Sequence, residues 1–237
     1  MKLVRSLIVN ADDFGQSPGV NRGIIQAFEE GIVTSASLMV RWPAANEAAK
    51  FAIEHPNLSL GLHLDLGEWI CRGDDWVPLY EVVDLENSNA VAEEVSRQVS
   101  TFHRLMGRPP THIDSHQHVH LNEPVRTVAG NLAGEANVPL RSCTSQVRYC
   151  GDFYGQTANG SRLPDVISVD GLIGILRMLS PGLTELGCHP GLDNDLDTMY
   201  NAERCQEVRV LCDPRIRAAL ASEGIELRSF NGLDAVF

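Results

Sequence analysis

The sequence Asn10-Ala11-Asp12-Asp13-Phe14-Gly15 follows directly on the apolar run Leu7-Ile8-Val9. Consecutive aliphatic residues of this kind predict a strand that is buried on both faces of a parallel sheet. Two adjacent carboxylates at the end of such a strand repel each other, and burial raises their pKa values unless a positive charge lies beside them. A divalent cation would supply that charge, with one aspartate as its ligand and the other free to act as a base. The alternative is an ordinary turn, because Asp and Gly are common turn residues.

Beyond this stretch, strand patterns alternate with helix patterns along the chain. Strands are predicted over 35–40, 58–66, 111–115, 138–142, 184–188 and 225–230, and helices over 20–30, 44–54, 91–106, 124–136, 169–179, 202–210 and 214–222. Two irregular excursions, 67–89 and 143–164, interrupt the alternation, and we interpret the first as a lid or one wall of a pocket. Alternation of this kind indicates an α/β fold in one domain, 1–237. With about seven parallel strands, a barrel is favoured over an open sheet.

Composition narrows the possible partners. The 237 residues are 43% hydrophobic and carry a formal net charge of -12. That charge argues against nucleic acid or an anionic membrane as a partner, since both require clusters of Lys and Arg. The N-terminal residues run straight into the first strand without a signal sequence, and no apolar run is long enough to span a bilayer. We therefore expect a cytoplasmic protein without a membrane span.

Polar side chains follow several predicted strands at the point where each strand ends. They are Asp12, Asp13, His63, His116, Arg141 and His189. In parallel α/β folds, the carboxyl ends of the strands meet at one edge of the sheet, and functional sites are built there. We expect these side chains to converge on such a site.

Four of the eight histidines fall within residues 112–120. If the strand continued, the even-numbered positions of this segment would share one face. They cannot all bind one ion, so some of them must orient ligands or brace the loop. Catalytic zinc sites commonly use three protein ligands and a water molecule. The candidate ligands are Asp13, His63 and one of His116, His118 and His120, and spacing alone does not choose among the last three.

At this point the chain resembles the YdjC-like carbohydrate deacetylases, a group that includes the diacetylchitobiose deacetylase and a hopanoid-biosynthesis relative. The resemblance rests on five stretches in matching order: Asn10–Gly15 (NADDFG), Gly31–Ser35 (GIVTS), Gly61–His63 (GLH), Pro110–His120 (PTHIDSHQHVH) and Cys188–Pro190 (CHP). It implies a deformed (β/α) barrel and metal-dependent removal of acetyl from an N-acetylated amino sugar. Gln117 departs from the pattern, since the chitobiose enzyme has a further histidine there.

The resemblance also implies roles for individual residues. It places the metal ligands at Asp13, His63 and His116, the catalytic base at Asp12 and a catalytic histidine at His189. The metal would polarise the acetamide carbonyl and acidify water, while Asp12 takes the water proton and His189 protonates the departing amine. Supporting roles around the ligands and the substrate are expected for four more residues. Asp65 and Asp114 would orient ligand histidines, Arg141 would pair with Asp12, and His118 would brace the histidine loop.

Two other functions are compatible with the same residues. One is a different metal-dependent hydrolase, acting on a phosphoester or a cyclic amide, and the other is a non-catalytic sugar-binding protein. One divalent metal ion is expected for the deacetylase; an Asp with two His suits zinc but accepts magnesium or manganese. A two-metal phosphoesterase would need additional carboxylate ligands, and Asp65, Asp114 and the extra histidines leave that alternative open. A homodimer is the commonest oligomer of soluble proteins, and the sequence carries no further signal for one.

Overall fold

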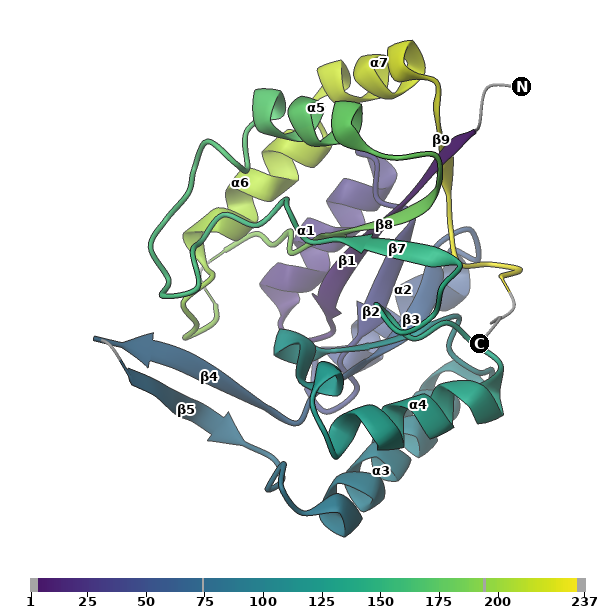
Figure 1. Cartoon of the computed structure of the whole chain (residues 1–237), viewed down its shortest axis with the longest axis vertical. Helices are drawn as coiled ribbons and strands as arrows, with labels where there is room; N and C mark the ends of the chain where they lie inside the picture. Colours follow the sequence, from purple (N-terminus) through teal and green to yellow (C-terminus); the bar gives the residue numbers. More distant parts are fainter. Residues whose placement is uncertain (1–3, 74, 194, 234–237) are drawn as a thin grey trace.

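The fold is built around a curled parallel sheet. The computed structural model describes residues 4–73, 75–193 and 195–233 (Figure 1). In this part of the chain, seven strands form one sheet in the order β6-β3-β2-β1-β8-β7, and β9 pairs with the first half of β1. The strands are β1 (Arg5–Phe14), β2 (Ser35–Leu38), β3 (Ser59–Leu64), β6 (Ile113–Ser115), β7 (Val147–Cys150), β8 (Gly182–Cys188) and β9 (Ile225–Arg228). All their pairings are parallel, which confirms the predicted α/β class.

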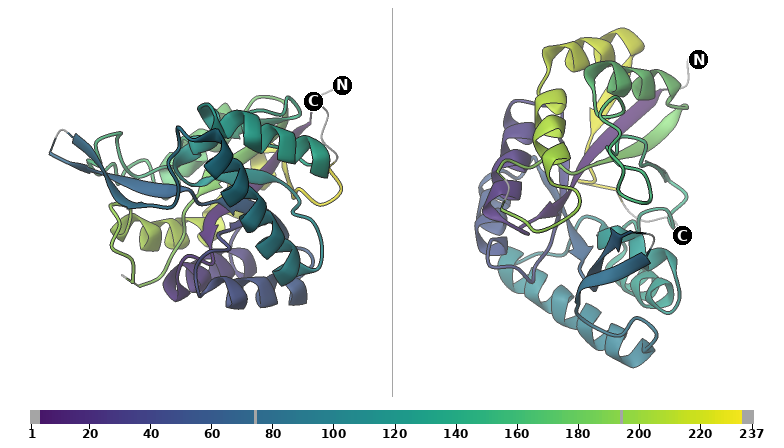
Figure 2. Two further views of the ribbon diagram at one scale, coloured as in Figure 1. Left: turned by 90° about the horizontal axis from the view of Figure 1, so that it is seen from below. Right: turned by 90° about the vertical axis from the view of Figure 1, so that its left-hand side faces the viewer.

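Helices surround the outside of the curled sheet and give it the form of a half-barrel (Figures 1 and 2). They are α1 (Pro18–Glu29), α2 (Ala45–Glu54), α3 (Ser88–Met106), α4 (Val125–Ala136), α5 (Val169–Met178), α6 (Ala202–Leu211) and α7 (Pro214–Glu223). Each lies within a few residues of its predicted range. No helix in the described ranges combines the length and apolarity that a membrane crossing requires.

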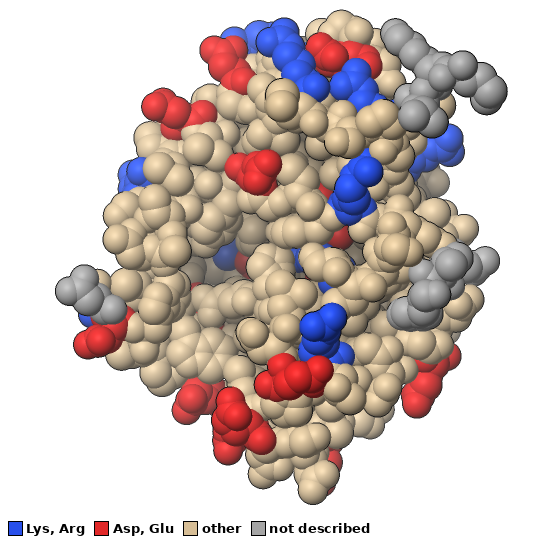
Figure 3. Space-filling view, viewed as in Figure 1, with Lys and Arg blue, Asp and Glu red and all other residues tan. Residues whose placement is uncertain are grey.

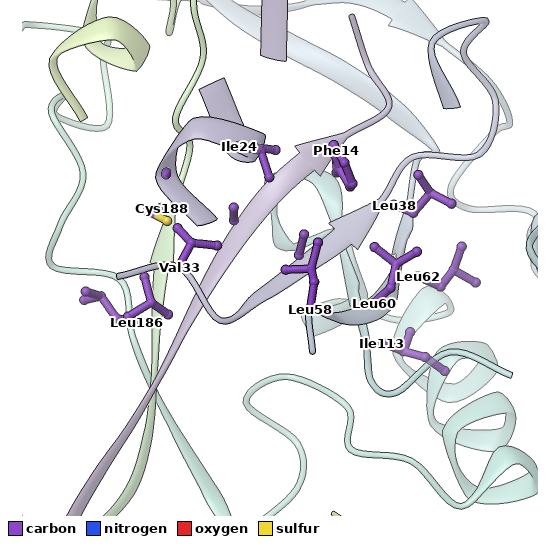
Figure 4. Close-up of a cluster of buried hydrophobic side chains, with 14 of the residues drawn as sticks. Phe14, Ile24, Val33, Leu38, Leu58, Leu60, Leu62, Ile113, Leu186 and Cys188 are labelled. Carbon is purple, nitrogen blue, oxygen red and sulfur yellow. The ribbon is translucent and has the colours of Figure 1, made fainter. Parts of the chain in front are cut away.

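The core lies between the central strands and the helices that cover them. Leu7, Val9 and Phe14 of β1 are fully buried, as the apolar run predicts. Figure 4 shows Phe14 and Leu38 among the other apolar side chains of this cluster, which come from β2, β3, β6 and β8 as well as β1. Burying apolar side chains on neighbouring strands fixes the strand register, because a one-residue slip would turn them to the opposite face.

Helix α1 starts where the chain supplies capping groups. The Ser17 side chain accepts a hydrogen bond from the Val20 amide, and Pro18 occupies the first turn, where its missing N–H does no harm. Further along α1, a Cβ on Gly23 would lie 2.3 Å from the Cα of Gly191. The absence of a side chain at Gly23 therefore lets α1 approach the turn that follows β8.

The stretch 138–142, predicted as a strand, forms a single bridge with the described residues, between Ile113 and Leu140. The prediction was wrong because Pro139 has no N–H to donate, and because Ser142 has a φ of 59° that ends the extended backbone. The strand between α4 and α5 is instead β7, which lies beside β8 at the opposite edge of the sheet, inside the segment 143–164 that we predicted to be irregular.

The other excursion, 67–89, is also more regular than predicted. It contains β4 (Gly67–Arg72) and β5 (Asp75–Glu81), which pair as an antiparallel hairpin separate from the main sheet. The hairpin projects from the body of the molecule beside the ends of the central strands (Figures 1 and 2). Its position fits the interpretation of this segment as a wall of a pocket.

Candidate active site

The carboxyl ends of β1, β3 and β6 bring together the aspartate pair, His63 and His116. Asp12 and Asp13 interrupt the pairing of β1 with β2, because the register shifts between Ala11 and Phe14. Asp13 has a φ of 69°, a left-handed conformation that Asp tolerates better than most residues. Irregularities of this kind re-aim side chains at sheet ends, and here Asp13 faces the neighbouring strands.

Asp13, His63 and His116 place their ligand atoms within 4.8 Å of one another, and all three residues are buried. The Oδ1 atom of Asp13 lies 3.1 Å from Nδ1 of His116 and 3.3 Å from Nε2 of His63. The Nε2 atom of His63 is buried and has no hydrogen-bond partner among the described residues. A buried nitrogen without a partner, facing a carboxylate and a second imidazole, fits a divalent cation of the zinc type.

The pKa values of these two histidines are raised. Burial alone would lower them, but Asp114 raises the pKa of His63 to about 10, and Asp13 raises that of His116 to about 9. Asp114 acts directly, because its Oδ1 lies 2.7 Å from Nδ1 of His63. Asp114 thus lies where a residue that orients His63 is expected.

Asp12 is held by Arg141 through two hydrogen bonds of 2.6 and 2.7 Å. Burial would raise the pKa of Asp12, but the guanidinium keeps it below its usual value. Arg141 also contacts Asp114 at 2.7 Å. A second possible metal group, Asp12, His63 and Asp114, meets the same distance limit. Arg141 already neutralises the carboxylates of Asp12 and Asp114. A cation bound by this second group would therefore have to displace the guanidinium.

After Ser115 the chain leaves the strand and forms the short 3₁₀ helix η1 (His116–Leu121). Gln117 and His118 have φ values of 49° and 55°, so the even-numbered positions do not share one strand face. His116 faces Asp13, while His118 lies 3.3 Å from the Tyr149 hydroxyl. His120 turns away to Ser115 and the Arg141 carbonyl oxygen, at 2.6 and 3.1 Å, and braces the loop.

His189 directly follows β8. Its Nε2 lies 3.8 Å from Oδ2 of Asp12, and its buried Nδ1 has no partner in the described part of the chain. Burial lowers the pKa of His189 to about 4, against the opposing effect of Asp12. The imidazole is therefore neutral near pH 7 in this state.

Among the described residues, the Asp65 side chain makes no hydrogen bond or ion pair with His63 or His116. Its carboxylate accepts hydrogen bonds from Arg41, Trp42 and Tyr80 at 2.9, 3.0 and 3.0 Å. These contacts tie β5 to the segment after β2, so the structure places Asp65 where it supports the hairpin.

The sequence analysis did not identify three charged residues near the site, which are Glu68, Arg204 and Glu207. Arg204 contacts Asp13, Glu68 lies beside His116, and Glu207 accepts a hydrogen bond from the backbone N–H of His189. Glu203, Arg204 and Glu207 are all buried on α6. Charged residues at helical spacing indicate a site only weakly, and only when the face of the helix that is buried is already known.

A cavity of about 600 Å³ is lined by Asp12, Asp13, His63, Glu68, His116, His189 and Arg204, among others. The face shown in Figure 3 is hollowed, and mainly uncharged residues surround the hollow. Aromatic side chains from the hairpin, from 149–154 and from the segment before α6 contribute to the lining, namely Trp69, Trp76, Tyr149, Phe153, Tyr154 and Tyr200. Flat apolar surfaces beside buried polar groups suit a ligand such as a sugar, which has both kinds of surface.

Comparison with protein families and relatives confirms the resemblance drawn from the motifs. The family model of the YdjC-like protein matches residues 6–222. The chain is 36% identical to a carbohydrate deacetylase of Geobacillus stearothermophilus, over 95% of this chain and 97% of the relative. It is 32% identical to a chitooligosaccharide deacetylase of Serratia marcescens, over 96% of this chain and 98% of the relative.

Solved structures support the same fold. A putative cellobiose-phosphate cleavage protein from Enterococcus faecalis V583 is 27% identical, with a TM-score of 0.77 over 98% of this chain and 99% of the other. A family 4 carbohydrate esterase from Streptomyces lividans in complex with acetate is 13% identical, with a TM-score of 0.55 over 98% of this chain and 97% of the other. At that identity the second likeness shows the fold alone, a barrel-like arrangement of strands and helices.

Proposed function

The chain belongs to the YdjC-like family, and we propose that it is a metal-dependent deacetylase of an N-acetylated amino sugar or oligosaccharide. Two full-length relatives are named as deacetylases of carbohydrate and of chitooligosaccharide. The observation that carries the proposal is the convergence of Asp13, His63 and His116, with Asp12 beside them but turned to Arg141.

Asp13, His63 and His116 would hold the metal ion. An ion there supplies Lewis-acid activation of the acetamide carbonyl and of water. One carboxylate and two imidazoles suit zinc, while magnesium is the alternative for the same site. The hydrogen bond that Nδ1 of His63 donates to Asp114 supports this assignment, because it leaves Nε2 of His63 facing Asp13 and free to ligate.

Asp12 would accept the proton of the attacking water. Its low pKa keeps it ionised at neutral pH, and the two hydrogen bonds from Arg141 restrict its rotation. A base that is fixed in orientation loses less entropy in the reaction than a mobile one. Arg141 thus acts by positioning Asp12, and it contacts Glu185 through Nε as well, at 2.8 Å.

His189 would deliver a proton to the departing nitrogen, which is a very poor leaving group when it is not protonated. In the free protein the imidazole is neutral. Negative charge that develops on the substrate during attack favours the imidazolium, so we propose that His189 takes up its proton at that stage. Asp12, 3.8 Å away, is the adjacent group that has just received one.

Acetate release tests the function. Purified protein would be assayed on N-acetylated mono- and disaccharides after metal removal, and again after zinc or magnesium is restored. We expect release only with metal present, and loss of both metal retention and turnover in His63→Ala. His103→Ala, at an exposed position on α3, is the matched control and should behave as wild type. Undiminished release by the metal-free protein, or no release from any acetylated sugar by the loaded protein, would refute the proposal.

A further inference from the structure

Glu68 lies at the base of the projecting hairpin and has no role in the reaction outlined above. Only 4% of its surface is exposed. Its Oε1 accepts a hydrogen bond of 2.6 Å from the Thr198 hydroxyl. Its Oε2 lies 3.6 Å from Nε2 of His116, which is its one ion-pair partner within the described ranges. A buried carboxylate is costly unless a charged or donor group compensates it.

The two imidazoles of the candidate metal site each face a second carboxylate, which is hydrogen-bonded to the ring in the case of His63 but lies 3.6 Å from the ring in the case of His116. His63 presents Nε2 to Asp13, and its other nitrogen is held by Asp114. His116 presents Nδ1 to Asp13 at 3.1 Å, and its other nitrogen faces Glu68. Each ring thus lies between the common ligand Asp13 and a second, buried carboxylate.

The hairpin is fixed against the histidine turn at this point. The Gln117 side-chain amide accepts a hydrogen bond from the Trp69 backbone N–H and donates one to the Trp69 carbonyl oxygen, at 2.9 and 2.8 Å. Two hydrogen bonds from one side chain to one residue define the position of β4 relative to η1. Glu68, the preceding residue, is held beside His116 by this clamp and by Thr198.

We propose that Glu68 is a positioning residue of the metal site, which accepts the Nε2–H of His116 and so fixes Nδ1 as the ligand atom. A histidine that binds a metal commonly donates its other N–H to a carboxylate, which sets the tautomer and the ring orientation. Reaching a normal hydrogen-bond distance from 3.6 Å requires the two groups to approach by roughly 0.5 Å. The hairpin is then part of the metal centre as well as a wall of the cavity. This inference rests on the proposed function only in that His116 binds the metal.

Zinc affinity tests the role of Glu68 without any assay of turnover. The Kd for zinc would be measured by competition with a chromophoric chelator for wild type, Glu68→Ala, Glu68→Gln and Glu81→Ala. Glu81 is an exposed carboxylate of the same hairpin, paired in register with Gly67, and is the matched control. We expect Glu68→Ala to weaken zinc binding about 10- to 100-fold, the usual range for loss of such a partner.

Glu68→Gln keeps the size of the side chain and one acceptor oxygen, so a smaller loss of roughly 3- to 10-fold is expected. If Glu68→Ala does not fold, the zinc affinity of Glu68→Gln tests whether Glu68 positions His116. Zinc-loaded protein with ¹⁵N-labelled histidine supplies a second measurement. In wild type we expect His116 to carry its proton on Nε2, and in Glu68→Ala we expect that proton to exchange faster with solvent.

The outcomes separate the two proposals. If the Glu68 variants bind zinc as Glu81→Ala does, while His116→Ala loses zinc, the role of Glu68 is refuted and the metal site stands. If His116→Ala binds zinc as wild type does, the ligand set itself is wrong and the proposed function fails with it.

Discussion

Arg204 on α6 donates a hydrogen bond of 2.7 Å from Nη2 to Oδ2 of Asp13, which lies 191 residues earlier in the chain. The other oxygen of Asp13 is thereby left to face His63 and His116. Arg204 is itself fixed, because its Nε donates to the Tyr200 carbonyl oxygen at 2.8 Å. Burial would raise the pKa of Asp13, but Arg204 holds it well below its usual value.

Replacing Arg204 with Met should destabilise the metal-free protein more than the zinc-loaded protein. Without the guanidinium, Asp13 is a buried charge without its partner, and breaking such a pair costs about 3–5 kcal/mol. A bound cation would neutralise the same carboxylate and recover part of that loss. The free energy of unfolding in urea, measured with and without zinc, checks this expectation.

Arg228→Met is the control for this experiment. Arg228 pairs with Glu226, and both side chains are more than half exposed, so their pair contributes only about 0–1 kcal/mol. Equal destabilisation of Arg204→Met with and without zinc would show that Arg204 and the cation do not share Asp13.

Asp12→Asn should retain metal and lose turnover. The amide cannot accept the water proton, and loss of a general base lowers rates by about 10²- to 10⁴-fold. The fold should persist, because Arg141 keeps Asp114 and Glu185 as partners. Metal content and kcat for acetate release are the two measurements. An Asn variant with wild-type kcat would remove Asp12 from the role of base.

The meeting of Asp13 and His63 with the histidine segment could be predicted because parallel strands end at one edge of a sheet, whereas the choice of His116 within that segment came from the family resemblance. The strand pattern around each residue was enough to place it at that edge. The even-numbered histidines were not placed correctly by spacing, since Gln117 and His118 adopt left-handed backbone conformations that end the strand. Periodicity describes only residues that remain in a regular element.

Glu68 and Arg204 reach the site by packing that no local pattern records. Glu68 depends on how the hairpin lies against η1, and Arg204 depends on how closely α6 approaches the turn after β8. At that turn, a Cβ on Gly191 would lie 3.1 Å from the Cδ of Arg204. The strand predicted over 138–142 failed for a local reason, because Ser142 takes a left-handed backbone conformation that ends the extended stretch. By contrast, β7 is a strand through its pairing with β8, which no local pattern predicts.

His112 should make the protein less stable as the pH falls. Burial lowers its pKa to about 4, and the ring stacks on Phe230 with centroids 3.9 Å apart. In the unfolded chain the pKa returns to about 6.5, so the unfolded state binds more protons between these values. The contribution of neutral His112 is therefore intact above pH 6.5 and lost progressively towards pH 4, by up to about 3 kcal/mol.

Urea unfolding of wild type and His112→Gln at several pH values between 7 and 4 isolates this contribution. The variant is expected to start less stable, since Ser37 loses its contact of 3.1 Å with the ring, but to lose less stability on acidification. Subtracting the free energy of unfolding of the variant from that of wild type at each pH cancels the contribution of other titrating groups. Parallel curves would mean that His112 is not a neutral buried group.

Trp76→Ala should weaken the binding of an N-acetylated disaccharide but not that of a monosaccharide. Trp76 lies on β5, is 53% exposed and lines the cavity, so it can contact a second sugar unit beyond the one held at the metal. Loss of an aromatic contact of about 1 kcal/mol corresponds to a KM roughly five-fold higher for an N-acetylated disaccharide. The KM for the monosaccharide and both kcat values should stay unchanged.

Met178→Ala, at an 83% exposed position outside the cavity lining, is the control. Equal increases in KM for both sugars would place Trp76 at the reacting sugar, and no increase for either would exclude it from substrate binding.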